Sequence, residues 1–540
     1  MWIKKCVRSL LYILPLVLFF SFWPVIRLGG NESMNFELSL PLVWLVMFDG
    51  VGLLVLARER KLFDWARGRR WLWLLFPVWL SLTVIWSLNV TRGVLTAGIM
   101  WLLYFAGYVM WTVRKTLDER FRVVWWKWFF GSALVMCGWC VVQCVLDLAG
   151  VGQDYSLMCD GCTYHMFGFP HPNGFAIEPQ FMGNLLLAPA MAAAWLFSRG
   201  DCNSAFRGRG SSRPSLRGSD PSSLGRNLRK PLKTLLPVAS QESYDNGSCS
   251  LCSNFILACF FIITATLFLT FSRGAIYAFV VGMLFMSGFV VFGVKKRERG
   301  ALWKRVGMVW GLVILSFVVV LNAQGLMAEV GPTSDTYFDG VAKVVNHLSL
   351  GVIDLRGDDA TEPGGEMGNT EGKLMEDEFV VVENSVENFE EKVVENSELE
   401  SEVEEPVFSG YVAESTDTRV RLSGAAVQVW SQSVPNALFG VGLGGAGFAL
   451  YNNGLSPAPK EIVQNEYASL LLETGLVGVS LFVLTLILVI GVIWKNSARV
   501  MLIGLLVSYG ISLMFFSGLP NALHIVLFPV VIEVLARDQN

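Results

Sequence analysis

The sequence predicts an all-α, polytopic integral membrane protein with about twelve transmembrane helices. The chain has 540 residues, of which 53% are hydrophobic, and its mean hydropathy is +0.50. Only 16% of the residues are charged, against about 25% in an ordinary soluble domain. Nineteen Trp support a membrane protein, because Trp is enriched where lipid meets water. This composition excludes a soluble enzyme, a disordered protein and a nucleic-acid binder.

The expected spans are stretches of about 20 mostly apolar residues, which is enough to cross a hydrocarbon core roughly 30 Å thick. They fall at residues 10–27, 38–57, 71–88, 94–112, 123–149, 175–197, 254–271, 275–294, 306–322, 475–494, 499–516 and 522–536. The first is not expected to be a cleaved signal peptide, because Trp23 and Pro24 stand where small residues would be needed.

The orientation follows from the Lys and Arg residues of the short loops, which favour the cytoplasmic side. If the N-terminus lies inside, five net-basic loops all become cytoplasmic: 58–70, 113–122, 198–253, 295–305 and 495–498. The loops at 28–37, 89–93, 150–174, 323–474 and 517–521 then lie outside. We therefore expect a multi-pass protein of the cytoplasmic (inner) membrane, with both termini cytoplasmic and an extracytoplasmic active face.

The chain divides into three parts. Residues 1–322 contain the first nine spans and a Ser-, Gly- and Arg-rich linker at 198–253, which is too poor in apolar residues to form a core. Residues 323–474 form a large outer loop, and residues 475–540 hold the last three spans. Within the loop, residues 354–405 hold nineteen carboxylates and three basic residues, so we expect a solvated acidic insert rather than a calcium site.

The ten cysteines do not predict a metal site. Three pairs have Cys-x-x-Cys spacing: Cys137/Cys140, Cys159/Cys162 and Cys249/Cys252. The second pair falls outside and the third inside, so the two cannot share one zinc ion. The second pair is a candidate disulfide, and the first is expected to pack within its span. We expect neither a metal nor a cofactor.

Arg273 stands in the short sequence FSRGA between two expected spans, on the outer side. An arginine at this boundary departs from the positive-inside pattern, and it is costly unless it reaches water or is paired. One interpretation is an interfacial arginine that reaches water. The other is a fork-shaped donor for phosphate, a role that suits a guanidinium better than an ammonium group.

The outer stretch GFPHPNGFAIEPQFMGN, residues 168–184, leads into another span. It contains Glu178, followed by Pro179, and His171, one of only four histidines. Glu178 is either a charge favoured by the helix dipole or a catalytic or acceptor-binding group. His171 is a candidate substrate-binding side chain.

The arm that returns from the outer loop holds the third candidate region. Residues 419–434 have the pattern of an amphipathic helix lying at the membrane interface. The following sequence GVGLGGAG is not expected to bind a nucleotide, because no strand precedes it and it lies outside the cell. A tight loop with close backbone approach fits this sequence better.

These regions together resemble the O-antigen ligase family of membrane proteins, which includes polysaccharide polymerases and protein O-oligosaccharyltransferases. The resemblance rests on FSRGA in a mid-chain span, on RLSGAAVQVW followed by FGVGLGG, and on QNEYASLLLETGLVG at the start of a late span. It covers most of the chain in architecture. Each motif is short, and their order and spacing carry the resemblance.

The resemblance implies transfer of a glycan from an undecaprenyl-diphosphate carrier to an acceptor hydroxyl, outside the cytoplasmic membrane and without a metal. The leaving diphosphate would then need fixed cations. Arg273 matches the arginine of the family's Ser-Arg-Gly motif and would bind the diphosphate. Arg421, or its neighbour Arg419, matches the arginine that begins the outer-loop arm.

The chain departs from the family at the expected general base. Where family ligases usually have His-Asn, this chain has Gln464-Asn465, followed by Glu466. A Gln side chain has no titratable proton and cannot act as a base. Gln464 either orients the substrate, or Glu466, Glu461, Glu178 or His171 takes the proton, or the reaction is a variant one.

The expected partners are an undecaprenyl-diphosphate-linked glycan, a glycan, lipid or protein acceptor, and the lipid bilayer, with no nucleic acid. The sequence does not distinguish ligase from polymerase. The alternative is a transporter or flippase of a lipid-linked or anionic substrate, although no internal repeat supports it. A scaffold that binds partners through its acidic loop is a third hypothesis.

Overall fold

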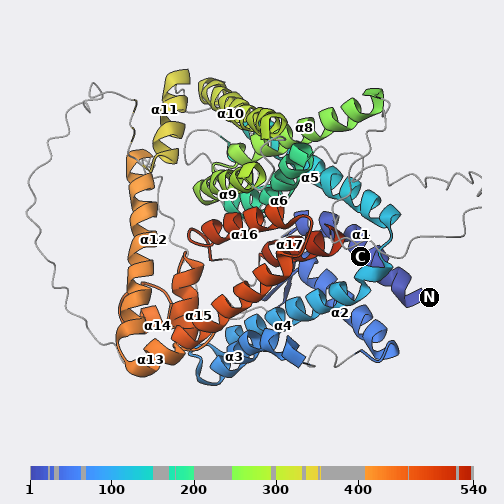
Figure 1. Cartoon of the computed structure of the whole chain (residues 1–540). Helices are drawn as coiled ribbons and strands as arrows, with labels where there is room; N and C mark the ends of the chain where they lie inside the picture. The colour runs from blue at the N-terminus through green and yellow to red at the C-terminus, as the bar shows by residue number, and fades with distance from the viewer. Residues whose placement is uncertain are drawn as a thin grey trace, which may run out of the picture.

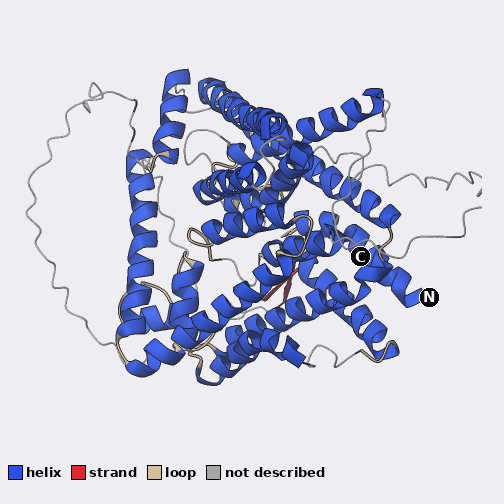
Figure 2. Ribbon diagram, in the orientation of Figure 1, coloured by secondary structure: helices blue, strands red, loops and turns tan. Residues whose placement is uncertain are grey.

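The computed structural model describes residues 2–21, 25–28, 36–61, 68–149, 170–176, 178–199, 246–292, 299–330, 336–350, 353, 355, 408–459, 461–517 and 522–536. Helices make up almost all of these residues, and Figure 2 shows one small strand pair among them. Most of the expected linker, nearly all of the acidic insert and the Cys159/Cys162 pair lie outside the described residues, as do the side chains of Cys249 and Cys252.

The N-terminal half consists of α1 (Trp2–Phe19), α2 (Leu40–Arg58), η2 (Gly68–Leu74), α3 (Leu75–Thr83), η3 (Val84–Trp86), α4 (Val90–Val113), η4 (Arg114–Thr116), α5 (Glu119–Leu148) and α6 (Pro179–Arg199). Strands β1 (Val25–Leu28) and β2 (Phe36–Ser39) form an antiparallel pair in which Ile26 lies opposite Leu38. The expected helix at residues 10–27 is therefore wrong at its end. It stops at Phe19, and Val25–Leu28 find their backbone partners in β2 instead.

The C-terminal half consists of α8 (Asn246–Leu269), α9 (Arg273–Phe292), α10 (Arg299–Val330), α11 (Tyr337–Leu348), α12 (Phe408–Ser431), α13 (Val434–Phe439), α14 (Ala446–Asn452), α15 (Glu466–Ile493), α16 (Arg499–Ser512) and α17 (Leu523–Ala536). Figure 1 places α12 along one side of the helix bundle, away from both chain ends. Of the helix expected over residues 419–434, the part to Ser431 lies within α12, and the expected end is wrong because Val434 begins the separate helix α13.

Among the residues that the structure describes, seven helices are long and apolar enough to cross a membrane: α2, α4 with η4, α5, α6, α9, α10 and α15. Four shorter apolar helical segments cover Trp71–Trp86, Ser253–Leu269, Arg499–Ser512 and Leu523–Ala536. Each of these eleven segments overlaps with one of the expected spans after the first, with bounds that differ by several residues. An all-α, multi-pass membrane fold is confirmed, while the twelve-span topology stays a prediction.

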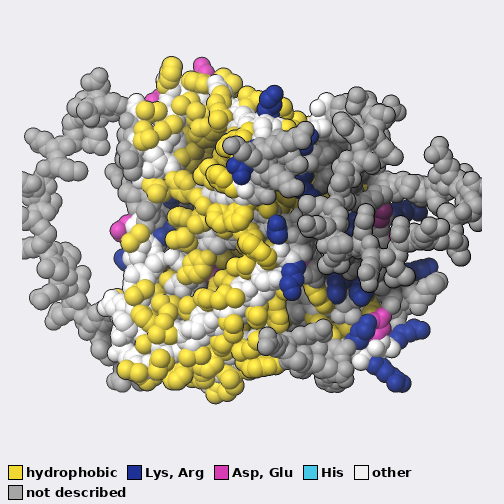
Figure 3. Space-filling view, in the orientation of Figure 1, with side chains coloured by type: hydrophobic (Ala, Val, Ile, Leu, Met, Phe, Trp, Pro, Cys, Tyr) yellow, Lys and Arg dark blue, Asp and Glu magenta, His cyan; other side chains and the backbone are white. Residues whose placement is uncertain are grey.

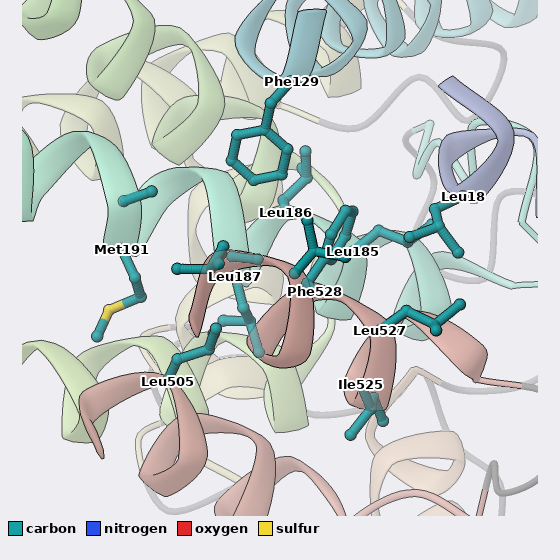
Figure 4. Packing of buried hydrophobic residues seen from close by; sticks show 14 of the residues in the cluster. Leu18, Phe129, Leu185, Leu186, Leu187, Met191, Leu505, Ile525, Leu527 and Phe528 are labelled. Carbon is teal, nitrogen blue, oxygen red and sulfur yellow. The ribbon is translucent and has the colours of Figure 1, made fainter. Parts of the chain in front are cut away.

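Helix α6 is the centre of the bundle, and all its side chains from Phe181 to Ser198 are buried. It contains five Ala and Gly183, small residues that let neighbouring helices approach closely. Figure 4 shows Leu185, Leu186 and Leu187 of α6 among Phe129 of α5 and Phe528 of α17. A helix buried on every side holds its N-terminal end in a fixed place, which matters for the site below.

Charge is distributed unevenly over the surface. In Figure 3, hydrophobic side chains cover a broad face, and Lys and Arg gather toward the side where Figure 1 places both chain ends. The positive-inside rule predicts this distribution for cytoplasmic termini. The orientation in the membrane itself stays a prediction.

Candidate functional site

The FSRGA sequence forms a tight turn between α8 and α9. Phe271 adopts a left-handed conformation with φ of 48°, which is uncommon for an aromatic residue. The Ser272 hydroxyl accepts a hydrogen bond from the Ala275 amide at 3.3 Å, as a helix cap does. Arg273 is the first residue of α9, and only 8% of it is exposed. The turn therefore places a buried guanidinium at a helix N-terminus.

The start of α6 packs directly against this turn. A Cβ atom on Gly183 would lie 2.6 Å from that of Ala275, and one on Gly274 would lie 3.2 Å from the side-chain nitrogen of Gln180 in α6. Only glycine at both positions permits the contact. The N-terminal ends of α6 and α9, each with a positive dipole end, are thus brought together.

The stretch before α6 is fixed to α5 by buried amide contacts. The Gln143 side chain accepts a hydrogen bond from the Gly174 amide at 2.9 Å and donates one to Asn173 Oδ1 at 3.1 Å. These contacts set the course of the chain through His171 to Glu178, whose carbonyl oxygen accepts from the Phe181 and Met182 amides of α6.

Glu178 is half-buried at the start of α6. Burial raises the pKa of its carboxyl group, and the positive charge of Arg419 acts in the opposite direction. The structure therefore brings together two candidates that are 241 positions apart in the sequence, the carboxyl group of Glu178 directly before α6 and the guanidinium of Arg419 in α12.

The two candidate arginines of α12 have different environments. Arg419 is half-buried, and one of its terminal nitrogens donates a hydrogen bond to the Phe515 carbonyl at 3.4 Å. Arg421 is exposed. Residues two positions apart on a helix do not face the same side. The structure thus brings Arg419 near Glu178 and His347, whereas Arg421 points to another side of α12.

His347 of α11 lies among these candidates, although no sequence motif pointed to it. It is 6% exposed, and its Nε2 forms a hydrogen bond of 3.1 Å with the Phe271 carbonyl. Burial lowers the pKa of His347 to about 3, and the positive charges of Arg273, His171 and Arg419 contribute in the same direction. Because all three basic groups act on the pKa of His347, they must all lie near its buried, neutral imidazole.

The loop after α16 joins the remaining candidates to the site. The Phe515 carbonyl accepts hydrogen bonds from Gln180 at 2.7 Å and from Arg419. The Leu513 carbonyl accepts one from the Glu466 amide at 3.0 Å. Because these contacts use backbone carbonyl groups, no sequence motif could have identified the loop.

At the start of α15, the side chains of Asn465 and Glu466 form hydrogen bonds within the protein. Asn465 caps the helix, accepting hydrogen bonds from the Tyr467 amide at 3.0 Å and the Ala468 amide at 3.2 Å. The Glu466 carboxylate accepts one from the Ser517 hydroxyl at 3.2 Å. Gln464 is half-buried directly before this cap. Of the three residues, Glu466 contacts the loop that follows α16, through the Leu513 carbonyl and the Ser517 hydroxyl.

The glycine-rich sequence is a close-packing loop, as expected. Gly440, Gly442 and Gly444 all have positive φ values. A Cβ atom on Gly442 would lie 2.3 Å from the Ser87 Cα atom, and the Ser87 hydroxyl donates to the Leu443 carbonyl at 2.7 Å. This loop fixes the return arm onto the segment between α3 and α4.

The assembled site suits an anion. It combines two helix N-termini with Arg273 and Arg419, and a guanidinium and a helix N-terminus each favour phosphate. Glu178 and His171 add groups that can accept a proton. Among the residues that the structure describes, no three His, Cys, Asp or Glu side chains are grouped to hold a metal ion, and Cys137 and Cys140 are buried in α5.

Comparison with known proteins gives one family. A family model described as O-antigen ligase matches residues 258–483. This range includes Arg273, His347, Arg419 and the start of α15, whereas Glu178 lies before it. No curated protein matches the chain.

Proposed function

Because a family model described as O-antigen ligase matches residues 258–483, we propose that the chain transfers a glycan from an undecaprenyl-diphosphate carrier to an acceptor hydroxyl. The reaction takes place on the outer face of the cytoplasmic membrane. The observation that carries this proposal is the meeting of Arg273 and Arg419, from distant segments, beside the N-termini of α6 and α9.

The two arginines bind the diphosphate of the donor. As the bond between the anomeric carbon and the diphosphate oxygen breaks, negative charge develops on the leaving group. Preorganised donors stabilise charge that develops in the transition state, and burial strengthens their effect. Arg273, the more buried of the two, is expected to contribute more.

Glu178 takes the proton of the acceptor hydroxyl as its oxygen bonds to the anomeric carbon. A general base works best when its pKa lies near the working pH, and burial raises the pKa of Glu178 in that direction. Glu466 is less suited, because the Ser517 hydroxyl donates a hydrogen bond to its carboxylate, which favours the charged form. In this proposal Gln464 orients the acceptor.

The direct test uses cells that carry a clickable surface glycan. We expect deletion of the gene to abolish the link between glycan and acceptor, and the wild-type gene to restore it. Arg273→Ala, at normal membrane levels, is expected not to restore it. Full glycan production by that variant would contradict the proposal. Uptake or flipping that depends on the protein in proteoliposomes would instead support the transporter alternative.

A further inference from the structure

We infer that His347 is a positioning residue that holds the α8–α9 turn in the conformation that presents Arg273. The inference rests on the proposed function, because it concerns how the diphosphate-binding arginine is fixed. His347 itself contacts the turn rather than the reacting atoms. It belongs to α11, in the first part of the expected outer loop.

The first observation is the hydrogen bond between His347 Nε2 and the Phe271 carbonyl, at 3.1 Å. A carbonyl oxygen only accepts, so Nε2 carries the proton and donates it. Phe271 has φ of 48°, a conformation that is unfavourable for a bulky residue and persists only where the surroundings impose it. Phe271 lies two residues before Arg273. The hydrogen bond from His347 to its carbonyl therefore holds the backbone that sets the position of the arginine.

A second contact joins the same two elements. The Tyr277 hydroxyl of α9 donates a hydrogen bond to the Leu348 carbonyl at the end of α11. Tyr277 lies one helical turn after Arg273. The end of α11 thus holds the α8–α9 turn on both sides of the arginine.

Helix α11 is itself rigidly supported. Thr336 and Asp339 form a reciprocal capping box at its start. A Cβ atom on Gly340 would lie 2.6 Å from that of Ala328, and one on Gly325 would lie 2.5 Å from the Tyr337 ring. This close packing on α10 gives His347 a fixed base from which to hold the turn.

The charge state of His347 suits this role. Its charged neighbours are Arg273 from α9, Arg419 from α12 and His171 from the stretch before α6. A neutral imidazole can donate from Nε2 without adding a positive charge beside the two guanidinium groups. Burial and these charges keep the pKa of His347 at about 3, so it stays neutral at physiological pH.

The test measures binding of geranylgeranyl diphosphate to the purified full-length protein in lipid nanodiscs. His347→Leu removes the donor, and we expect about tenfold weaker binding, the size of one lost hydrogen bond. His347→Gln keeps an N–H donor of similar reach and is expected to bind within about threefold of wild type. His524→Gln is the matched control, because His524 is also buried but lies in α17, and it should bind normally.

A double-mutant cycle separates positioning from general loosening of the fold. If His347 acts through Arg273, His347→Leu should weaken binding no further in an Arg273→Ala background. Tyr277→Phe provides a milder second variant, with an expected loss of about threefold that also disappears in that background. Losses that simply add to that of Arg273→Ala, or no rescue by His347→Gln, would overturn the inference.

The same data distinguish this inference from the proposed function. If Arg273→Ala binds the diphosphate as well as wild type, the proposed role of Arg273 fails. If Arg273→Ala binds weakly but His347→Leu and Tyr277→Phe bind normally, only the positioning role of His347 fails.

Discussion

The two parts of the return arm, α12 and the glycine-rich loop at residues 440–445, reach the helix bundle in different ways. Helix α12 brings Arg419 to the Phe515 carbonyl and into the electrostatic surroundings of Glu178 and His347. The glycine-rich loop brings backbone into contact with Ser87 and carries no charged side chain.

Within the return arm, therefore, α12 contributes a charged side chain to the site, whereas the glycine-rich loop contributes only close backbone packing. Glu473 also holds this arm in place, because its carboxylate accepts a hydrogen bond at 3.3 Å from the amide of Ala446, the residue that follows the loop. Glu473 thus fixes the arm to α15. A motif residue near a site can be needed for structure alone, and the following variants are chosen to separate the two roles.

The largest loss of activity is expected for Arg273→Ala. Removing a preorganised donor from a buried anion site typically slows a reaction by about 10²- to 10³-fold. Arg273→Lys keeps the charge but loses the bidentate fork, so we expect partial recovery. Glycan transfer in isolated membrane vesicles, normalised to protein level, measures both, and equal activity of the Ala and wild-type proteins would remove Arg273 from the site.

Glu178→Gln is expected to slow transfer by about 10²-fold, the usual contribution of a general base. The base must be deprotonated, so wild-type activity should fall on acidification as Glu178 takes up a proton. Since burial raises the pKa of Glu178, this fall should begin at a higher pH than for an ordinary Glu.

The pH profile of transfer identifies the base. Glu178→Gln should lose the acid limb, and Glu466→Gln should keep it. The reverse pattern would assign the proton to Glu466.

Arg419→Ala should have a smaller effect than Arg273→Ala, about tenfold, because Arg419 is less buried. Arg421→Ala is the matched control on the same helix, and an exposed side chain away from the site should change activity by less than about twofold. Rates measured side by side at equal protein level decide between them. A greater loss for Arg421→Ala would mean that α12 presents its other face to the substrate.

Gly442→Ala should act on abundance rather than on chemistry. The added Cβ has no room beside Ser87, and the positive φ is unfavourable for Ala. A destabilised protein is expected to be several times less abundant in the membrane. Gly424→Ala, in α12, has open space around it and should accumulate normally.

The quantity that separates the two roles is activity per folded molecule, measured as transfer divided by the amount of protein in the membrane. For Gly442→Ala it should remain near that of wild type. A large drop in this ratio at normal abundance would show that the glycine-rich loop belongs to the site after all.

The sequence predicted the helical membrane fold well, because runs of apolar residues directly reflect burial in lipid or in the bundle. It also identified Arg273, Glu178, His171 and Arg419 as candidates, through charge at unusual places and through the family resemblance. It could not choose between Arg419 and Arg421, since that choice depends on the rotation of α12 about its axis.

Two further features could not be read from the sequence. His347 occurs without a neighbouring motif, and its importance comes from burial beside Arg273 and Arg419. The loop at residues 513–517 contributes carbonyl groups, which every residue has. Strand β1 was mistaken for the end of a span, because four apolar residues can serve either structure.

The proposed function depends above all on the site facing the outside of the membrane, and cysteine labelling tests this most directly. Met514 lies in the loop beside the site and is 48% exposed, and Lys495 is exposed before the opposite end of α16. In intact spheroplasts, a membrane-impermeant maleimide should label Met514→Cys above the level of the parent protein and leave Lys495→Cys unlabelled until the cells are opened. Labelling of Lys495→Cys from outside, with Met514→Cys protected, would contradict the account.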